Sequence, residues 1–199
     1  MIRIENVSKE IKNNVVLNNI NLELKEGEII LLKGHNGSGK TMLLRLICGF
    51  INPTIGNVVG TNGYSFGVII ENPVFFLQET AFYNLKYLAS INKVITNDEV
   101  NNHLKKLNLY EVRNKKVKTF SLGMKQRLAL CQAFMENPDV LLLDEPFNAI
   151  DDENLKIVYE LIEEFRKNKK IIVIASHGDV SNLKFSKIIK MNNGKIISN

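Results

Sequence analysis

The chain has 199 residues, of which 45% are hydrophobic and 24% charged, and its formal net charge is +5. These values are ordinary for a soluble protein and suit one sizeable domain, or a core with an inserted lobe. No stretch approaches the roughly 18 apolar residues of a membrane span, and the N-terminus lacks the layout of a signal peptide. We therefore expect a cytoplasmic protein. Cys48 and Cys131 fall on apolar helical segments, which favours buried, reduced thiols over a disulfide.

Alternation of apolar residues opens the chain and predicts antiparallel strands. The alternating positions are Ile2 and Ile4, then Ile20, Leu22 and Leu24, with a turn expected at Asn13-Asn14. The apolar run at residues 28–33 predicts a buried strand.

A glycine-rich stretch follows that strand and has the spacing of a phosphate-binding loop: Gly34, His35, Asn36, Gly37, Ser38, Gly39, Lys40 and Thr41. Its glycines can turn successive N–H groups toward phosphate oxygens, and the next helix adds its N-terminal partial positive charge. Lys40 supplies an ammonium group for the β and γ phosphates, and Thr41 supplies a hydroxyl ligand for Mg²⁺. The alternative is a strand-to-helix turn that binds nothing.

The helix after the loop should bury one face, since its apolar residues recur at helical spacing: Leu43, Leu46, Ile47 and Phe50. Asn52-Pro53 ends that helix, and residues 54–57 indicate a further turn. Residues 64–70 predict another strand, which ends at residues 71–73.

From about Glu79 to Asn137 the pattern is helical. Thr80 can cap a first helix, residues 96–99 form a capping box, and Ser121 can cap a helix that runs to Glu136. His103 lies on the second of these helices. We interpret it as a solvated surface histidine, because no second metal ligand is suggested.

Strand patterns return with the all-apolar run at residues 140–143, which suits the centre of a parallel sheet. A helix near residues 153–167 and a buried strand at 171–175 complete a βαβ unit. The chain ends in a hairpin with its turn at Asn193-Gly194.

Two carboxylates, Asp144 and Glu145, stand at the end of the strand at 140–143, where open α/β sheets bind ligands. Asp144 can hold Mg²⁺ through water. Glu145 can orient or deprotonate the water that attacks a γ phosphate. The alternative is an acidic turn that caps the next helix.

Just upstream, residues 120–127 read Phe-Ser-Leu-Gly-Met-Lys-Gln-Arg and resemble the signature motif of the nucleotide-binding subunits of ABC (ATP-binding cassette) transporters. Residues 147–151 resemble the family's D-loop, and Ser176-His177 resembles its switch histidine. The resemblance covers essentially the whole chain.

The resemblance implies an α/β fold with a P-loop NTPase (RecA-like) core of mostly parallel strands and an N-terminal antiparallel β part. Residues 1–75 and 137–199 would form the core, and residues 76–136 an inserted α-helical subdomain. The implied activity is ATP hydrolysis that powers a separate transmembrane permease, at the cytoplasmic face of the membrane.

The resemblance also implies site residues, with ATP and Mg²⁺ as cofactors. Glu145, His177 and Lys40 would be catalytic, and Thr41, Asp144 and Glu71 would hold the metal. Nucleotide contacts would come from residues 34–41, Met42 and Glu71, and also from Ser121, Gly123 and Asp151, which act across a dimer. The second subunit is an identical copy or a sister subunit, and no direct nucleic-acid partner is expected.

Three departures from the family's pattern stand out. Ile11 lies about where an aromatic ring stacks on adenine, and Glu71 replaces the Q-loop glutamine. Leu122 and Met124 replace the usual Gly and Gln of the signature. The segments at 69–73 and 121–127 together are similar to exporters of lantibiotic- and bacitracin-like peptides.

Two alternatives remain open. A soluble ABC-type ATPase that acts on nucleic acid or ribosomes would carry long coiled coils or two cassettes. An unrelated P-loop kinase or GTPase would lack the signature motif.

Overall fold

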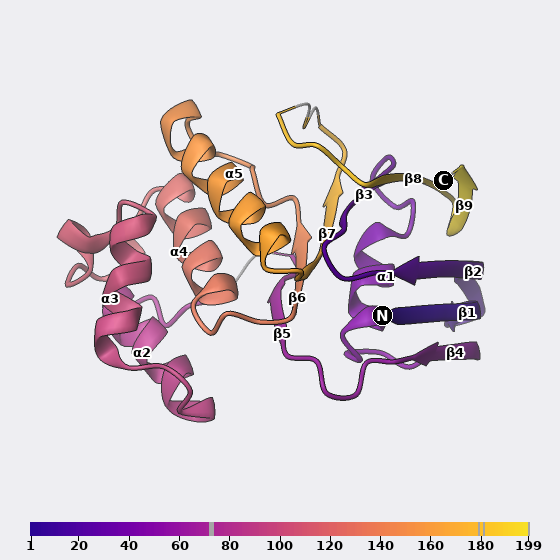
Figure 1. The fold of residues 1–199 in the computed structure, drawn as a ribbon, viewed down its shortest axis with the longest axis horizontal. Coiled ribbons are helices and arrows are strands. Elements are labelled where there is room, and N and C mark those ends of the chain that lie inside the picture. The colour runs from indigo at the N-terminus through magenta and orange to yellow at the C-terminus, as the bar shows by residue number, and fades with distance from the viewer. Residues whose placement is uncertain (72–73, 179, 181, 199) are drawn as a thin grey trace.

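The computed structural model describes residues 1–71, 74–178, 180 and 182–198. Within these residues a six-stranded sheet of order β5-β6-β7-β3-β8-β9 forms the centre of the protein (Figure 1). The strands are β3 (Ile29–Lys33), β5 (Phe66–Ile69), β6 (Val140–Asp144), β7 (Ile171–Ser176), β8 (Lys187–Asn192) and β9 (Lys195–Ser198).

All neighbouring strands of this sheet run parallel except the β8–β9 hairpin. Every residue of β6 and β7 is buried, as expected for strands that are covered on both faces. The predicted parallel sheet and C-terminal hairpin are therefore confirmed.

A smaller antiparallel sheet of order β2-β1-β4 comprises β1 (Ile2–Ile11), β2 (Asn14–Leu24) and β4 (Ile55–Val59) in the described chain. Ile2 lies opposite Leu24, and Ile4 opposite Leu22, so the alternating apolar residues share one buried face. The turn expected at residues 54–57 is wrong, because Ile55 begins β4. A Cβ at Gly56 would lie 2.4 Å from the carbonyl oxygens of Glu5 and Asn6, so this glycine permits close strand pairing.

Helix α1 (Lys40–Ile47) lies between the two sheets (Figure 1). It buries Leu43, Leu44, Leu46 and Ile47 against both. Phe50 was expected on this face, but it lies beyond the helix and is 66% exposed. Gly49 has φ 76°, and the Phe50 N–H donates to the Arg45 carbonyl at 2.9 Å. This Schellman arrangement ends the helix before it can reach Phe50.

The other face of the large sheet carries α4 (Leu122–Phe134) and α5 (Asp152–Lys167), whose Phe134 and Phe165 rings meet edge to face at 4.9 Å. Helices α2 (Ala81–Asn92) and α3 (Asn97–Lys106) lie outside α4, on the side away from the small sheet (Figure 1). Short 3₁₀ turns at Tyr110–Val112 and Val117–Thr119 lead into α4.

The predicted caps are confirmed: Thr80 accepts from the Tyr83 N–H, and Thr96 and Glu99 form the capping box. One buried cluster runs from α2 and α3 through α4 to the large sheet. The bounds of the helical subdomain, residues 76–136, therefore stay a prediction.

His103 is half-buried on α3 and is not the solvated histidine expected, because α3 turns this face toward α4. Burial, and then the charge of Lys106, lower its pKa. The thiol of Cys131 is fully buried, whereas Cys48 is half-buried at the end of α1; neither forms a disulfide within the described chain.

No helix in the described ranges is long and apolar enough to cross a membrane.

Candidate functional site

The predicted loop, the two carboxylates and the histidine gather at one edge of the large sheet, because three parallel strands end there in register. Lys33 of β3 pairs with Ser176 of β7, and Asp144 of β6 pairs with Ala175. The segments that follow these strands are the loop at residues 34–39, then Glu145, then His177. Parallel pairing therefore collects motifs that are more than a hundred residues apart in sequence.

The phosphate-binding loop presents the start of α1 without a side-chain cap. Gly39 occupies the N-cap position with φ 103°, and no side chain of the described residues accepts from the first N–H groups. Those groups have no intrahelical partner and carry the positive end of the helix dipole. The Lys40 ammonium donates to the Gly34 and His35 carbonyls at 2.7 and 3.2 Å, which holds it against the loop.

The β8–β9 hairpin supports the loop from behind. A Cβ at Gly34 would lie 2.4 Å from the Met191 carbonyl oxygen, so only glycine allows this approach. The Gly194 N–H donates to the Ser38 carbonyl at 3.0 Å, and a His35 ring nitrogen lies 2.8 Å from the Asn192 side-chain oxygen. This contact with Asn192, and then the Asn36 carbonyl, raise the pKa of the exposed His35.

A pocket of about 520 Å³ opens above the loop and is lined by residues 36–42. Two of its walls are not indicated by any sequence motif: Val15 and Val16 of β2, and Asn193-Gly194 of the hairpin turn. The sequence indicates only a turn at Gly194. In the structure, a Cβ there would lie 2.5 Å from the Val16 carbonyl oxygen, so the turn packs closely against β2. Ile11 is not among the lining residues, so the apolar side chains nearest the loop come from the next strand.

Thr41 and Asp144 meet at the floor of this pocket, where the Thr41 hydroxyl donates to the Asp144 carboxylate at 2.6 Å. Asp144 is only 9% exposed. Burial raises the pKa of Asp144, and the neighbouring charges of Glu145 and Glu71 act in the same direction. The hydrogen bond from Thr41 and the charge of Lys40 oppose this rise.

Glu145 also lines the pocket and is tied to His177. The Glu145 carboxylate accepts from the His177 backbone N–H at 2.9 Å and lies 2.6 Å from Nδ1 of its ring. It also accepts from the Ser176 hydroxyl at 3.2 Å. These contacts fix the carboxylate and the imidazole relative to each other. A carboxylate held in this way can orient a water molecule or accept its proton.

Ser121, Gly123 and Asp151 are not among the residues that line the pocket. Ser121 caps α4 by accepting from the Met124 N–H at 3.2 Å, and Asp151 caps α5. A Cβ at Gly123 would lie 2.4 Å from the Ala149 carbonyl oxygen, so the signature and D-loop segments are in close contact. The structure thus joins these segments to each other and leaves them outside the pocket of their own chain.

Glu71 follows β5 and likewise does not line the pocket. It has a left-handed backbone with φ 62°, and its carboxylate lies 2.5 Å from the Arg45 guanidinium. Asn72 and Pro73, which belong to the predicted segment 69–73, lie outside the described residues.

The groups around the loop fit magnesium and a triphosphate. A hydroxyl and a carboxylate are the hard oxygen ligands that Mg²⁺ prefers. Mg²⁺ usually takes one or two carboxylates from a protein and its other ligands from phosphate and water. The Ser38 hydroxyl is fully buried and has no hydrogen-bond partner among the described residues.

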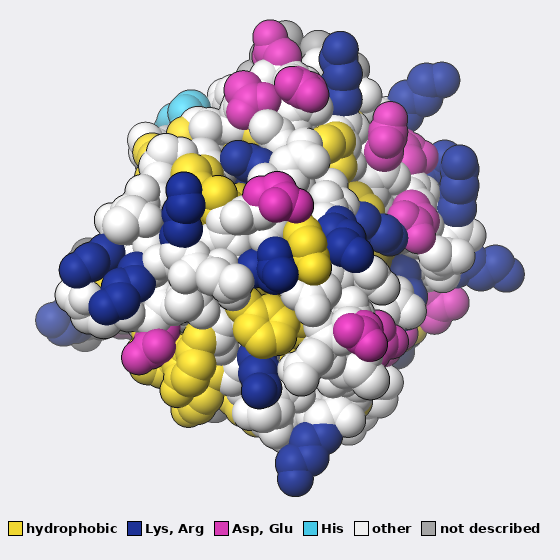
Figure 2. Space-filling model, turned by 90° about the vertical axis from the view of Figure 1, so that its left-hand side faces the viewer, with side chains coloured by type: hydrophobic (Ala, Val, Ile, Leu, Met, Phe, Trp, Pro, Cys, Tyr) yellow, Lys and Arg dark blue, Asp and Glu magenta, His cyan; other side chains and the backbone are white. Residues whose placement is uncertain are grey.

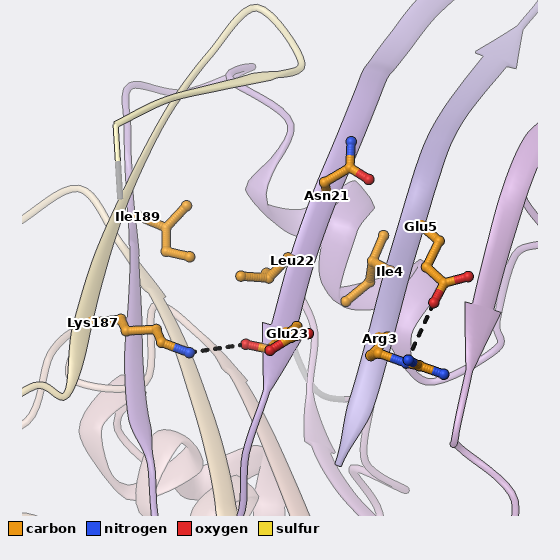
Figure 3. Close-up of a pocket in the computed structure, with 8 residues that line it drawn as sticks. All are labelled: Arg3, Ile4, Glu5, Asn21, Leu22, Glu23, Lys187 and Ile189. Atoms are coloured by element: carbon orange, nitrogen blue, oxygen red, sulfur yellow. Dashed lines mark hydrogen bonds and ion pairs between the residues drawn. The ribbon is translucent and has the colours of Figure 1, made fainter.

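A second pocket of about 490 Å³ lies between β8 and the small sheet and shares no lining residue with the pocket above the loop (Figure 3). Its charged groups already have partners. Lys187 donates to the Glu23 carbonyl at 3.2 Å, and Arg3 lies 3.3 Å from Glu5 (Figure 3). None of the predicted site residues lines it.

The burial of Asp144 yields a prediction about stability. Because its pKa is raised in the folded protein, stability falls as pH rises from the ordinary value of 3.8 through the raised value. Above that window the ionised carboxylate is a constant cost. We expect Asp144→Asn to be more stable than wild type at pH 7, with the difference shrinking toward pH 4, in urea unfolding of the nucleotide-free protein.

Asp139 provides the matched control. Hydrogen bonds from Ser65 and Lys170 lower its pKa to about 2, so its ionised form stabilises the fold at neutral pH. Asp139→Asn should therefore lose stability at pH 7. A loss of stability in Asp144→Asn as well would contradict the interpretation of the pocket floor.

Comparison with known proteins agrees with this geometry. The family model described as ABC transporter matches residues 17–148, well over half of the chain. An uncharacterised ABC transporter ATP-binding protein of Bacillus subtilis (strain 168) is 40% identical, over 98% of this chain and 94% of its own length.

Two further relatives have named transport roles. A lantibiotic transport ATP-binding protein of Streptococcus pyogenes is 31% identical, over 89% of this chain and 80% of its own length. A bacitracin transport ATP-binding protein of Enterococcus faecalis is 35% identical over 89% of this chain, which spans 61% of that protein.

Among solved structures, a dimeric bacterial ABC transporter cassette superposes with a TM-score of 0.91 at 26% identity, covering 100% of this chain and 97% of its own. The α/β P-loop fold with its antiparallel N-terminal sheet is confirmed. The chain belongs to the ABC transporter family, as an ATP-binding subunit with ATPase activity.

Proposed function

We propose that residues 34–42 hold the triphosphate of ATP and that Thr41 and Asp144 hold its Mg²⁺. The observation that carries this proposal is the Thr41–Asp144 hydrogen bond beneath an uncapped helix start, with the Glu145–His177 pair at the same sheet edge. Mg²⁺ would neutralise charge that develops on the phosphates. Lys40 would exchange its bonds to two loop carbonyls for bonds to phosphate oxygens.

Glu145 is the proposed base or water-orienting group. Its carboxylate lines the pocket and is held by Ser176 and His177, so it cannot turn away from the nucleotide. His177 in turn keeps its ring beside the carboxylate, where it can contact the γ phosphate or the attacking water. In this proposal the loop binds the triphosphate, and the Glu145–His177 pair orients the attacking water.

The signature and D-loop residues are proposed to act on the nucleotide of a second subunit. Ser121 stands at the start of α4, where N–H groups point outward and favour an anion. Ser121, Gly123 and Asp151 lie outside the pocket of their own chain, as a head-to-tail dimer requires. The similar dimeric cassette supports such pairing. The partner is a second copy or a sister subunit.

A groove of about 470 Å³ between β5 and helices α2 and α4 is the proposed docking site for the permease. Its rim carries exposed apolar side chains, with Phe50 at 66%, Ile91 at 64% and Val74 at 95% exposure. Exposed apolar residues that gather around a groove mark an interaction surface. Ile70 lines the groove and precedes Glu71, whose ion pair with Arg45 reaches the helix that starts at the phosphate-binding loop. Docking there would hold the chain at the cytoplasmic face of the membrane.

The proposed cargo is a peptide antibiotic of the lantibiotic or bacitracin type, moved outward. Support comes from the two relatives that are named for transport of these compounds.

Lysine and arginine on the helical face are dispersed among acidic and uncharged side chains (Figure 2). Such mixing is typical of a solvated surface and gives no support to a nucleic-acid partner.

Glu145→Gln tests the catalytic assignment. The amide can still bond to Ser176 and His177 but cannot accept a proton, so we expect ATP hydrolysis to fall at least roughly 100-fold with ATP affinity retained. Phosphate release and equilibrium binding of a fluorescent ATP analogue measure the two effects. Glu153→Gln, an exposed change at the start of α5, serves as the control. Turnover like that of wild type in Glu145→Gln would contradict the assignment.

A mixing experiment tests whether each site is shared between two subunits. Ser121→Asp keeps an N-cap residue but places a negative charge where a γ phosphate would lie, and Lys40→Ala removes the loop cation. Each variant alone should be inactive. Their mixture should recover up to roughly a quarter of wild-type turnover, since half of the dimers are mixed and each of these has one intact site.

Ser121→Asn, which caps without adding charge, controls for loss of the helix cap. If wild type alone dimerises and hydrolyses ATP but the mixture stays inactive, the shared site is excluded.

Growth tests address the cargo. A strain that lacks this chain should be more sensitive to a lantibiotic or to bacitracin, and wild type, but not Glu145→Gln, should restore resistance. Sensitivity to a ribosome inhibitor should stay the same in all strains. Unchanged sensitivity to every peptide antibiotic tested would reject the proposed cargo class.

A further inference from the structure

The ion pair between Arg45 and Glu71 connects the P-loop helix to the segment that follows β5. Nη2 of Arg45 lies 2.5 Å from Oε1 of Glu71. Glu71 adopts a left-handed backbone with φ 62°, a conformation that is uncommon for a residue with a side chain. The side chain of Arg45 is 32% exposed and that of Glu71 61% exposed, so water reaches the pair but does not surround it.

Arg45 stands on the same face of α1 as Thr41. The two residues are four positions apart on the helix, which places their side chains one above the other. Thr41 is hydrogen-bonded to Asp144 at the floor of the pocket. The ion pair with Arg45 holds the Glu71 carboxylate beside this helix, one turn from Thr41. Glu71 is therefore close enough to affect the electrostatics of the proposed magnesium site.

This arrangement concentrates negative charge where a triphosphate has to bind. Asp144 and Glu145 line the pocket, Glu71 is held beside α1 by Arg45, and Lys40 is held against the loop carbonyls. A third carboxylate would repel ATP unless a cation accompanied it. Among the described residues, Arg45 is the cation that lies within salt-bridge distance of Glu71.

We propose that Arg45 is a positioning residue whose ion pair with Glu71 neutralises that carboxylate, so that the chain can carry an acid at position 71 and still bind MgATP. The pair also holds Glu71 to the helix that carries Thr41. This inference rests on the proposed role of residues 34–42 and Asp144 in holding MgATP. It assigns a role to Arg45, a helix residue that no sequence motif marks as functional.

A double-mutant cycle tests the proposal. The dissociation constant of a fluorescent ATP analogue is measured with and without Mg²⁺ for wild type, Arg45→Gln, Glu71→Gln and the double variant. Arg45→Gln should weaken Mg²⁺-dependent binding about three- to tenfold, because it leaves the Glu71 charge uncompensated. Glu71→Gln and the double variant should differ from each other by less than about twofold. Arg45→Lys should restore most of the affinity, and raised salt should reduce the loss in Arg45→Gln.

Thermal unfolding of the nucleotide-free proteins separates this role from a merely structural one. In a merely structural role, the loss of ATP affinity would parallel the loss of stability and would not depend on the residue at position 71. If Arg45→Gln does not fold, the exchanged pair Arg45→Glu with Glu71→Arg replaces it in the cycle, and it should bind better than Arg45→Glu alone. Arg166→Gln removes a comparable pair with Glu163, at 2.7 Å on α5, and should leave binding unchanged.

Equal losses of affinity from Arg45→Gln in the wild-type and Glu71→Gln backgrounds would overturn the inference, as would an Arg45→Lys variant no better than Arg45→Gln. Lys40→Ala distinguishes this failure from failure of the proposed function. If Lys40→Ala abolishes binding while the cycle shows no coupling, only the role of the pair is lost. If Lys40→Ala binds like wild type, the loop does not hold the nucleotide.

Discussion

Parallel pairing of β3, β7 and β6 is the constraint on which the rest of this structure depends. It brings the ends of three buried strands level, so that the segments leaving them meet at one edge. The strands consist of apolar side chains on both faces and offer no polar group of their own until they end. Chemistry is therefore confined to the edge, where a helix start, two carboxylates and a histidine come together.

That edge combines groups which would repel one another in isolation. Asp144 is buried, and its pKa is raised as a result, yet a carboxylate is the ligand that a magnesium ion requires. Thr41 and Lys40 offset part of this cost, the first by a hydrogen bond and the second by its nearby charge, while Arg45 is paired with Glu71. With the proposed roles of Thr41 and Asp144, the site would give up stability without its ligand and recover it when a cation and phosphates bind.

The helical part of the chain is connected to this edge by side-chain hydrogen bonds and by one close backbone approach. The Gln126 side-chain amide donates to the Pro146 carbonyl at 3.1 Å, next to Glu145, and the Gly123 backbone lies against Ala149. Arg127 donates to the Leu107 carbonyl at 2.8 Å and to the Asn154 side chain at 3.2 Å. The start of α4, the D-loop and the end of α3 are thus joined, so a shift at Glu145 would reach the segments that are proposed to meet a second subunit.

The sequence by itself determined the elements whose identity is local. The loop at 34–41, the carboxylates after β6, the caps at Thr80 and Thr96 and the buried parallel strands all follow from spacing and periodicity within a few residues. The family resemblance added the signature and the switch histidine. Local signals can also mislead. Gly56 suggests a turn but permits pairing of β4 with β1, and the spacing of Phe50 suggests the buried face of α1 although the turn at Gly49 ends the helix first.

Only the tertiary structure decided which distant groups touch. The Glu145–His177 contact, the pocket walls at Val15 and Asn193, and the Arg45–Glu71 pair depend on strand order and register. Glu71 was noted from the sequence as an unusual charge, but its partner lies 26 positions earlier on a helix whose local pattern only predicts a buried face. Periodicity reports which face of an element is buried, whereas contacts between elements are set by how the sheet is assembled.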